Sequence, residues 1–247
     1  MRHSGPSSAV TDSGPLPAVS ILIPAFNEEA GIEECLGQVT RVMNEGTEVL
    51  VIDGGHDGTA AKVQQIAAIR PDVRYVPNHP DRGKGHAIRT GIGQARGRWH
   101  AQFDADLQFD AADLPALLEP LRTGRADVVL GSRFLPDSGR DVEATWVRSL
   151  GNRVVSAWVS LLFGQRFTDV MAGIKAWSAE AATRMDLRSD DYSYELEIPA
   201  RARRLGLRVV EVPVTTRARA QGASKVGVLA AGLRALAAAW RFRWERR

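Results

Sequence analysis

The sequence has little cysteine and no long uncharged apolar run. One cysteine among 247 residues, Cys35, excludes an intramolecular disulfide and a zinc site built from several cysteines, and it fits a reducing compartment. The longest apolar stretch, Val226 to Trp240, is interrupted by Arg234 and is too short to span a bilayer comfortably. The N-terminus carries no apolar segment of the secretory type, so we expect a cytoplasmic protein.

Motifs of several enzyme classes are also missing. The five histidines lack metal-ligand spacing, and no G-x-S-x-G elbow marks a serine hydrolase. The segment Arg82-Gly83-Lys84-Gly85 lacks the full G-x-x-x-x-G-K-[ST] spacing, which argues against a P-loop NTPase. A Gly-rich helix start that contains a lysine can still bind an anion. The alternative is that this segment is only a turn before a helix.

Charge is spread unevenly along a chain of otherwise ordinary composition. A hydrophobic content of 44% allows a sizeable core, and the length fits one large α/β domain or two small ones. The net charge is +3, but residues 201–247 alone carry +10 and residues 1–200 carry −7. Such a basic part suggests contact with phosphates, an anionic membrane or nucleic acid, the alternative being a solvated surface. A basic tail alone does not form a surface that recognises nucleic acid, so we predict no nucleic-acid partner. The oligomeric state stays open.

Short apolar runs alternate with helical spacings after a Ser-, Gly- and Pro-rich leader, residues 1–17, that we expect to be disordered. Asn27 is predicted to cap the first helix. The predicted strands cover 19–24, 48–52, 73–76, 98–101 and 128–130, and further helices cover 60–69 and 114–121. Another helix is opened by the segment 82–85 and runs to about Gln94. This alternation predicts an α/β fold with a mostly parallel, doubly wound sheet, in which ligands bind beyond the carboxyl ends of the strands.

The second half is less regular. We expect a helix over 146–163, a strand within 168–177 that crosses the site, and a helix over 194–205 that Gly206 closes. Residues 207–214 are predicted to form an edge strand because Pro213 cannot donate to a ladder. A last helix covers 226–244, with one apolar stripe formed by Val226, Leu229, Leu233, Leu236 and Trp240.

The stretch from Gln102 to Gln108 follows the fourth predicted strand and carries Asp104 and Asp106. Two carboxylates at i and i+2 converge on one ion if the chain turns there, and Gln108 adds an amide oxygen. Hard divalent cations take oxygen ligands and keep positions open for substrate phosphates. On spacing alone, a solvated turn is the alternative. Glu28 and Asp53 follow the first two strands, so these acids are expected to face one crevice.

A loop near the C-terminus, Arg219 to Lys225, places two cations around Gly222. Such a loop suits closure over phosphate, because arginine binds phosphate oxygens bidentately and lysine acts as a point charge. An ordinary basic loop is the alternative.

Several segments, taken in order, resemble the family 2 glycosyltransferases of GT-A fold, in the branch of dolichol-phosphate mannose synthases and polyprenyl-phosphate glycosyltransferases. The resemblance covers roughly residues 18–226. The matching segments are 20–29, Asp53 with 57–59, 82–85, 104–108, 131–133, Asp169 to Lys175, 192–197, 211–214 and 219–225. One departure is Ile52, since many relatives carry two consecutive aspartates at this point.

The resemblance implies an inverting transfer of a hexose, mannose or glucose, from a nucleotide-diphosphate sugar to a polyprenyl or dolichyl phosphate. It places Mg²⁺ or Mn²⁺ between the enzyme and the donor diphosphate. The residues it assigns to the donor are Pro24, Phe26, Glu28, Asp53, Lys84 and Asp104. Those it assigns to the metal are Asp104, Asp106 and Gln108; those it assigns to phosphates and the acceptor are Arg133, Arg148, Lys175, Arg219 and Lys225.

Two alternatives remain open at this point. A phosphate acceptor is already ionised, whereas a hydroxyl on a small molecule or glycan would need a general base, for which Asp191, Glu195 and Glu197 are the candidates. The third possibility is a nucleotide-sugar-binding or membrane-docking subunit without catalysis, against which the metal motif argues.

A lipid acceptor would require contact with a membrane surface. The helices over 146–163 and 226–244 are the candidates, because Trp240, Phe242 and Trp244 alternate with Arg241 and Arg243. The alternative is a core-packing helix with an exposed basic end. We therefore divide the chain into the leader, a GT-A domain over 18–225 and a basic amphipathic C-terminal helix over 226–247.

Overall fold

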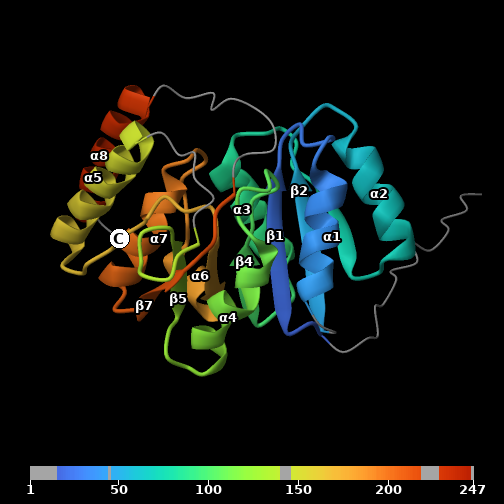
Figure 1. Ribbon diagram of the computed structural model, residues 1–247, viewed down its shortest axis with the longest axis horizontal. Helices are drawn as coiled ribbons and strands as arrows, with labels where there is room; N and C mark the ends of the chain where they lie inside the picture. Colours follow the sequence, from blue (N-terminus) through green and yellow to red (C-terminus); the bar gives the residue numbers. More distant parts are fainter. Residues whose placement is uncertain (1–15, 44–45, 140–145, 218–227, 246–247) are drawn as a thin grey trace, which may run out of the picture.

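The structure is a computed structural model that describes residues 16–43, 46–139, 146–217 and 228–245 (Figure 1). Of residues 146–148 and 228–231 only the backbone is described. The predictions for Arg219, Lys225 and nearly all of the leader therefore lie outside the described residues, as does that for the side chain of Arg148.

A seven-stranded sheet with the order β3-β2-β1-β4-β6-β5-β7 forms the centre of the molecule. The strands are β1 (Val19–Ala25), β2 (Thr47–Asp53), β3 (Val73–Pro77), β4 (Trp99–Gln102), β5 (Val128–Ser132), β6 (Lys175–Ser178) and β7 (Val209–Pro213). β6 runs antiparallel to β4 and β5, and the other neighbouring pairs are parallel. This confirms the mostly parallel α/β fold and places β7, with Pro213, at an edge.

Helices cover both faces of the sheet. They are α1 (Ile32–Val42), α2 (Thr59–Ile69), α3 (Lys84–Gln94), α4 (Leu114–Arg122), α5 (Trp146–Phe163), α6 (Ala179–Met185), α7 (Tyr194–Arg204) and α8 (Val228–Trp244), with a 3₁₀ turn at Ala111–Asp113. Side chains of each buried strand alternate between two cores. Ile21 and Ile23 enter the core under α1 and α4, whereas Leu22 enters the core under α3 and α7.

Three local predictions differ from the structure. The first helix begins at Ile32 and not at Asn27, which has φ 58° and accepts a hydrogen bond from the His56 N–H at 2.8 Å. Asn27 therefore joins the loops after β1 and β2 instead of capping a helix. The strand expected within 168–177 is confined to β6, because the Thr168 and Asp169 N–H groups bond to the Glu211 side chain and not to the backbone of a neighbouring strand. The short helix α6 was not anticipated.

The last helix packs on α5 and α7 through small residues. Ala235, Ala239 and Phe242 are buried, whereas Leu233 is 63% exposed and Trp240 is 51% exposed. Leu233 and Trp240 of the predicted apolar stripe therefore point away from the core, whereas Leu236 packs against it. Val226 and the side chain of Leu229 lie outside the described part of the chain. No helix in the described ranges is long and apolar enough to cross a membrane.

The core assignment predicts where truncation is costly. Ile21 of β1 is completely buried, so Ile21→Ala is expected to lower the free energy of unfolding by about 2–5 kcal/mol through lost burial and a residual cavity. Urea denaturation measures this. The control is Ile69→Ala at the exposed end of α2, where the change should stay within about 0.5 kcal/mol. Equal losses in both variants would contradict the assignment.

Candidate active site

The site lies where strands β1, β2 and β4 end and antiparallel β6 begins. Parallel strands end at the same edge of a sheet, and the register pairs Gln102, the last residue of β4, with Lys175, the first residue of β6. The first turns of α3 and α7 bring Lys84 and Glu195 to this edge. Segments distant in sequence thus meet around the residues that follow β4.

The acidic stretch after β4 does turn, as its predicted role requires. Residues 105 and 106 form the turn, and the Gln108 N–H donates to a carboxylate oxygen of Asp106 at 3.2 Å. Leu107 adopts the left-handed region with φ 60°, which is uncommon for a bulky residue and is held here by its buried side chain. The turn therefore has a fixed shape.

Asp104 belongs to a buried cluster of paired charges. The Lys84 ammonium donates to Asp104 Oδ2 at 2.7 Å and to Glu195 Oε1 at 3.1 Å. Lys175, fully buried, donates to the other oxygen of Glu195 and to the Ala172 carbonyl. The cluster matches two lysines with two carboxylates, as buried charges require.

Hydrogen bonds from neutral groups complete the surroundings of Glu195. The Tyr194 hydroxyl donates to Glu195 Oε1 at 2.6 Å. The Gln102 amide donates to the Gly173 carbonyl at 3.1 Å and lies 3.4 Å from both Asp104 Oδ1 and Glu195 Oε1. Neither Gln102 nor Tyr194 was singled out from the sequence, although the position of Gln102 at a strand end could have suggested it.

The surroundings of Asp104 and Glu195 shift the pKa values of the two acids in opposite directions. Burial, and the negative charges of Asp106 and Glu195, raise the pKa of Asp104 to about 6 against the opposing effect of Lys84. For Glu195, burial also favours the neutral acid, but Lys175 and Lys84 outweigh it and leave its pKa below the ordinary value. Burial lowers the pKa of Lys175 despite its pairing with Glu195. Glu195 is therefore held as a carboxylate.

Glycines at this edge of the sheet allow other parts of the chain to approach the backbone closely. A Cβ at Gly173 would collide with the Asp104 carboxylate, so only glycine leaves room for that side chain. In the Arg82–Gly85 segment, Gly83 has φ 117°, and a Cβ there would lie 2.8 Å from the Asp190 carbonyl oxygen. A Cβ at Gly85 would lie closer still to the Ser189 carbonyl oxygen. These two glycines admit the loop before α7, which the sequence pattern alone did not reveal.

The residues present fit a hard divalent cation. Asp104 and Asp106 are close enough for the charge of one to raise the pKa of the other, and Gln108 follows in the same turn. Among the described residues, no group of three or more His, Cys, Asp or Glu could hold a metal alone. The donor set is thus the partial, all-oxygen set that suits Mg²⁺ or Mn²⁺ with substrate phosphates as further ligands.

Aromatic rings gather on the side of the site next to Asp53. Asp53 is buried, which raises its pKa, and it accepts a hydrogen bond from the Gly55 N–H at 2.8 Å. The Phe26 ring meets His56 edge-on at 6.2 Å, and His56 stacks on His79 at 5.7 Å. Pro24 precedes this group in β1, and Glu28 follows it. His56 and His79 belong to no recognisable sequence motif, because they come from separate loops.

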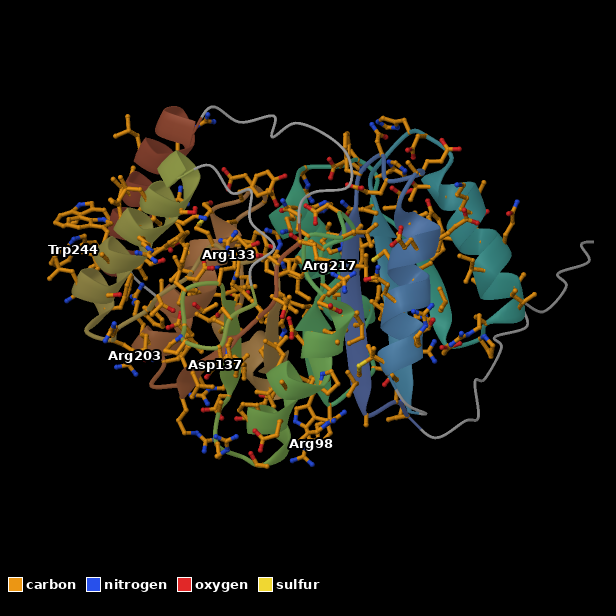
Figure 2. The ribbon with its side chains drawn as sticks, in the orientation of Figure 1. Arg98, Arg133, Asp137, Arg203, Arg217 and Trp244 are labelled. Carbon is orange, nitrogen blue, oxygen red and sulfur yellow. The ribbon has the colours of Figure 1, made fainter. Side chains whose placement is uncertain are left out.

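Arg133, labelled in Figure 2, lies beyond β5. Asp169 fixes its orientation. Its Nε and Nη2 donate to the two Asp169 oxygens at 2.6 and 2.9 Å, and its backbone N–H donates at 3.1 Å. The Asp169 N–H in turn donates to Glu211 at 2.9 Å. Burial lowers the pKa of Arg133, but its bonds to Asp169 more than offset this, so the guanidinium stays charged.

The remaining predicted residues are engaged in other ways. Lys175 offers no exposed surface to an acceptor phosphate, so its predicted direct contact is replaced by the pairing with Glu195. Glu197 is fully buried and accepts from the N–H groups of Arg188 and Ser189 and from Arg201. Asp191 accepts from the Ser193 N–H at 3.0 Å in the loop before α7.

The mostly parallel sheet, the acidic turn and the lysines beside it define a transferase of GT-A type. The model of the family described as Glycosyl transferase family 2 matches residues 20–158, more than half of the chain, and the protein belongs to this family.

The chain is similar to several glycosyltransferases. An undecaprenyl-phosphate mannosyltransferase of Micrococcus luteus is 32% identical over 84% of this chain and 87% of its own length. A polyprenol monophosphomannose synthase of Mycolicibacterium smegmatis is 28% identical over 91% and 87%. The chain also matches glycosyltransferase AglD of Haloferax volcanii at 32% identity over 79% of the chain, but spans only 32% of that protein.

Solved structures agree with the fold. Glucosyl-3-phosphoglycerate synthase from Mycobacterium tuberculosis, in a complex with Mn²⁺, UDP and glucosyl-3-phosphoglycerate, superposes with a TM-score of 0.70 at 25% identity. The likeness covers 92% of this chain and 80% of that one. A divalent metal and a nucleotide diphosphate thus occur together in a protein of the same fold.

The contact between Gly173 and Asp104 predicts that Gly173→Ala displaces the carboxylate. We expect a loss of Mn²⁺ binding, measured by calorimetry, with the overall fold retained in circular dichroism. Gly93→Ala in α3 is the control, because a Cβ there meets nothing within 4 Å. It should keep metal binding and raise stability by about 0.5–1 kcal/mol. Unchanged Mn²⁺ affinity in Gly173→Ala would contradict the role of this contact.

Proposed function

We propose that this enzyme transfers a hexose, mannose or glucose, with inversion from a nucleotide-diphosphate sugar to the phosphate of a polyprenyl or dolichyl phosphate. The observation that carries the proposal concerns the candidate general bases, above all the hydrogen bonds and the pKa of Glu195. Glu195 accepts hydrogen bonds from Lys84, Lys175 and Tyr194, and its pKa is lowered, which makes it a weak base. A phosphate acceptor is ionised already and needs positioning instead of deprotonation.

The donor side follows from the acidic turn. Asp104 and Asp106, with Gln108, are proposed to hold Mg²⁺ or Mn²⁺, which when bound offsets the charge that develops on the leaving diphosphate. Lys84 lies at the N-terminus of α3. Its ammonium group and the N-terminal end of this helix are both proposed to attract the leaving diphosphate. We assign the nucleoside to the side of Pro24, Phe26, Glu28 and Asp53.

The acceptor side follows from Arg133. A guanidinium whose orientation Asp169 fixes suits an anionic acceptor, since arginine matches the geometry of phosphate oxygens. The proposed roles of Arg148, Arg219 and Lys225 in holding phosphates stay predictions. Arg217, the last described residue before position 218, donates its N–H to the Gln108 carbonyl at 2.9 Å. A lipid acceptor implies work at the cytoplasmic face of a membrane.

The proposal is tested by measuring sugar transfer from a panel of nucleotide-sugar donors. Protein, polyprenyl phosphate and Mg²⁺ or Mn²⁺ are incubated with radiolabelled nucleotide sugars, and labelled lipid is extracted. Asp104→Ala and Asp106→Ala should each reduce transfer at least about a hundredfold, because each removes a carboxylate from the metal. Asp72→Ala, whose carboxylate pairs with Arg70 outside the site, is the control and should keep full activity. The absence of labelled lipid with every donor would reject the proposal.

A second candidate, transfer to a hydroxyl of a small molecule or glycan, is favoured by the likeness to glucosyl-3-phosphoglycerate synthase. The two candidates differ at Arg133. With a phosphate acceptor, Arg133→Lys should raise KM for the acceptor about tenfold, because the point charge of lysine replaces a planar fork, and leave donor affinity unchanged. Initial rates at varied acceptor and donor measure this. An unchanged acceptor KM, together with strong dependence on Glu195 or Glu197, would favour the hydroxyl acceptor.

A further inference from the structure

The outward face of α5 is apolar along its length. Leu150, Val154, Ala157 and Leu161 recur every three or four residues, so they form one stripe on the helix. All four are exposed, and Leu161 reaches 73%. The opposite face of the helix, at Val155 and Val159, is buried against the domain. An exposed stripe of this regularity exceeds the scattered apolar residues of an ordinary surface.

The adjacent helix α8 repeats the pattern. Leu233, Ala237, Trp240 and Trp244 form a second exposed stripe with the same spacing, and Trp244 is 62% exposed. The two helices pack side by side at one end of the molecule (Figure 1). Trp158 of α5 joins them, since its ring stacks on Trp240 at 6.1 Å and its indole N–H donates to the Leu236 carbonyl at 3.2 Å.

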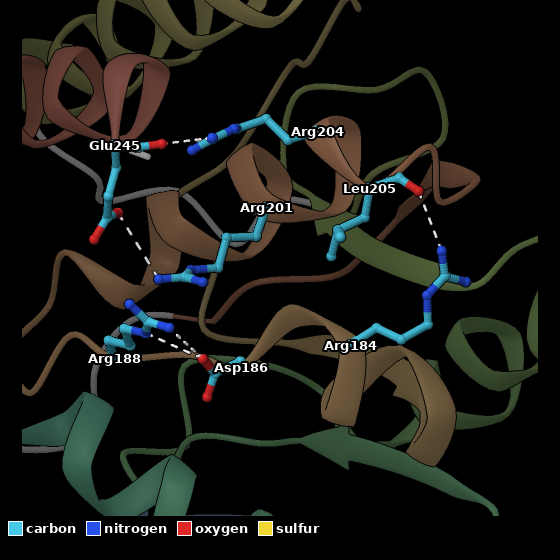
Figure 3. A pocket seen from close by; sticks show the side chains of 7 residues that line it. All are labelled: Arg184, Asp186, Arg188, Arg201, Arg204, Leu205 and Glu245. Atoms are coloured by element: carbon cyan, nitrogen blue, oxygen red, sulfur yellow. Dashed lines mark hydrogen bonds and ion pairs between the residues drawn. The ribbon is translucent and has the colours of Figure 1, made fainter. Parts of the chain in front are cut away.

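The orientation of α8 is fixed by its C-terminal end. There Arg204 donates to the carbonyls of Phe242 at 2.9 Å and Glu245 at 2.5 Å, and Arg201 lies 3.8 Å from the Glu245 carboxylate. These bonds cross a hollow of about 230 Å³ between α6, α7 and α8 (Figure 3). The exposed stripe is therefore a rigid part of the domain surface.

The charges on the two helices that carry the stripes are of one sign. Neither α5 nor α8 contains an aspartate or glutamate, while Arg153, Arg241 and Arg243 are exposed beside the stripes. A second hollow, of about 390 Å³, lies where α5 ends and is lined by Leu161, Phe163, Arg203, Arg204 and Arg243 among others. Arg203 and Trp244 are seen at this same end of the molecule in Figure 2.

We propose that the paired outward stripes of α5 and α8 form a docking face for an anionic lipid bilayer, with the arginine-lined hollow receiving lipid phosphate groups. Exposed tryptophan and leucine enter the interfacial region, and the arginines contact anionic headgroups. A second copy of the chain fits this face less well, because two such faces would bring arginines together without an acid between them.

The docking face is joined to the site by one aromatic side chain. The Arg153 guanidinium lies 4.8 Å from the centre of the Phe134 ring, and the Arg133 guanidinium lies 5.8 Å from it. A lipid that stays in the bilayer thus meets the enzyme next to the residue assigned to its phosphate. This link rests on the proposed function, whereas bilayer binding itself does not.

Vesicle flotation of the full chain tests the docking face, with phosphatidylcholine vesicles that contain or lack phosphatidylglycerol and without sugar donor or polyprenyl phosphate. Leu161→Glu, Trp244→Ala and Arg243→Glu should each lower the bound fraction on anionic vesicles, and the first two combined should lower binding at least about tenfold. Ile69→Glu, at the exposed end of α2, and Arg98→Glu, on another face, are the matched controls and should bind as the parent does.

Two further measurements make the outcomes distinct. Circular dichroism should show all variants folded, because the substituted side chains are exposed. Transfer to a polyprenyl phosphate dispersed in detergent should be unaffected by the docking variants, whereas the Asp104 variant should lose transfer and keep vesicle binding. The proposal is overturned if the parent chain does not float with anionic vesicles, if the controls lose binding equally, or if light scattering shows a dimer that these substitutions dissociate.

Discussion

The pairing of Lys84 with Asp104 and Glu195 is the interaction on which the site depends. Burying one carboxylate is costly unless a cation and hydrogen bonds surround it, and here strand β4, the start of α3, strand β6 and the start of α7 each contribute a partner. The cluster therefore ties four elements together at one edge of the sheet. It also leaves Asp106 as an additional negative charge next to Asp104, which makes the same place attractive to a cation.

This arrangement separates two tasks that a single carboxylate could not perform together. Glu195, surrounded by donors, keeps its charge and fixes Lys84 and Lys175, whereas Asp104 and Asp106 lie on the turn where oxygen ligands are needed. On the other side of β6, Asp169 and Glu211 hold Arg133 through a chain of hydrogen bonds that begins on edge strand β7. Positioning of charged groups, more than proton transfer, is what these contacts provide.

Local signals explain which features the sequence predicted. The alternation of apolar runs and helical spacings predicted the parallel sheet, whereas the D-x-D spacing left open whether the chain turns at Asp106. Pairings between distant residues left no local signal, so the burial of Lys175 against Glu195 and the stacking of His56 on His79 were not foreseen. The orientation of α8 was open for a similar reason: Ala235, Ala239 and Phe242 are its buried residues, whereas Leu233 and Trp244 are exposed, and this depends on the neighbouring α5 and α7.

The reversed direction of β6 has one further consequence. Because β6 runs against its neighbours, the segment before it arrives at the same edge where the other strands end. Within this segment Asp169 holds Arg133, and Gly173, four residues further along, leaves room for Asp104, so one short piece of chain borders both halves of the site. The halves of the site that we propose for the donor and for the acceptor are thus not separable modules. Exchange of either half for that of a relative would have to carry this segment with it, or the other half would be displaced as well.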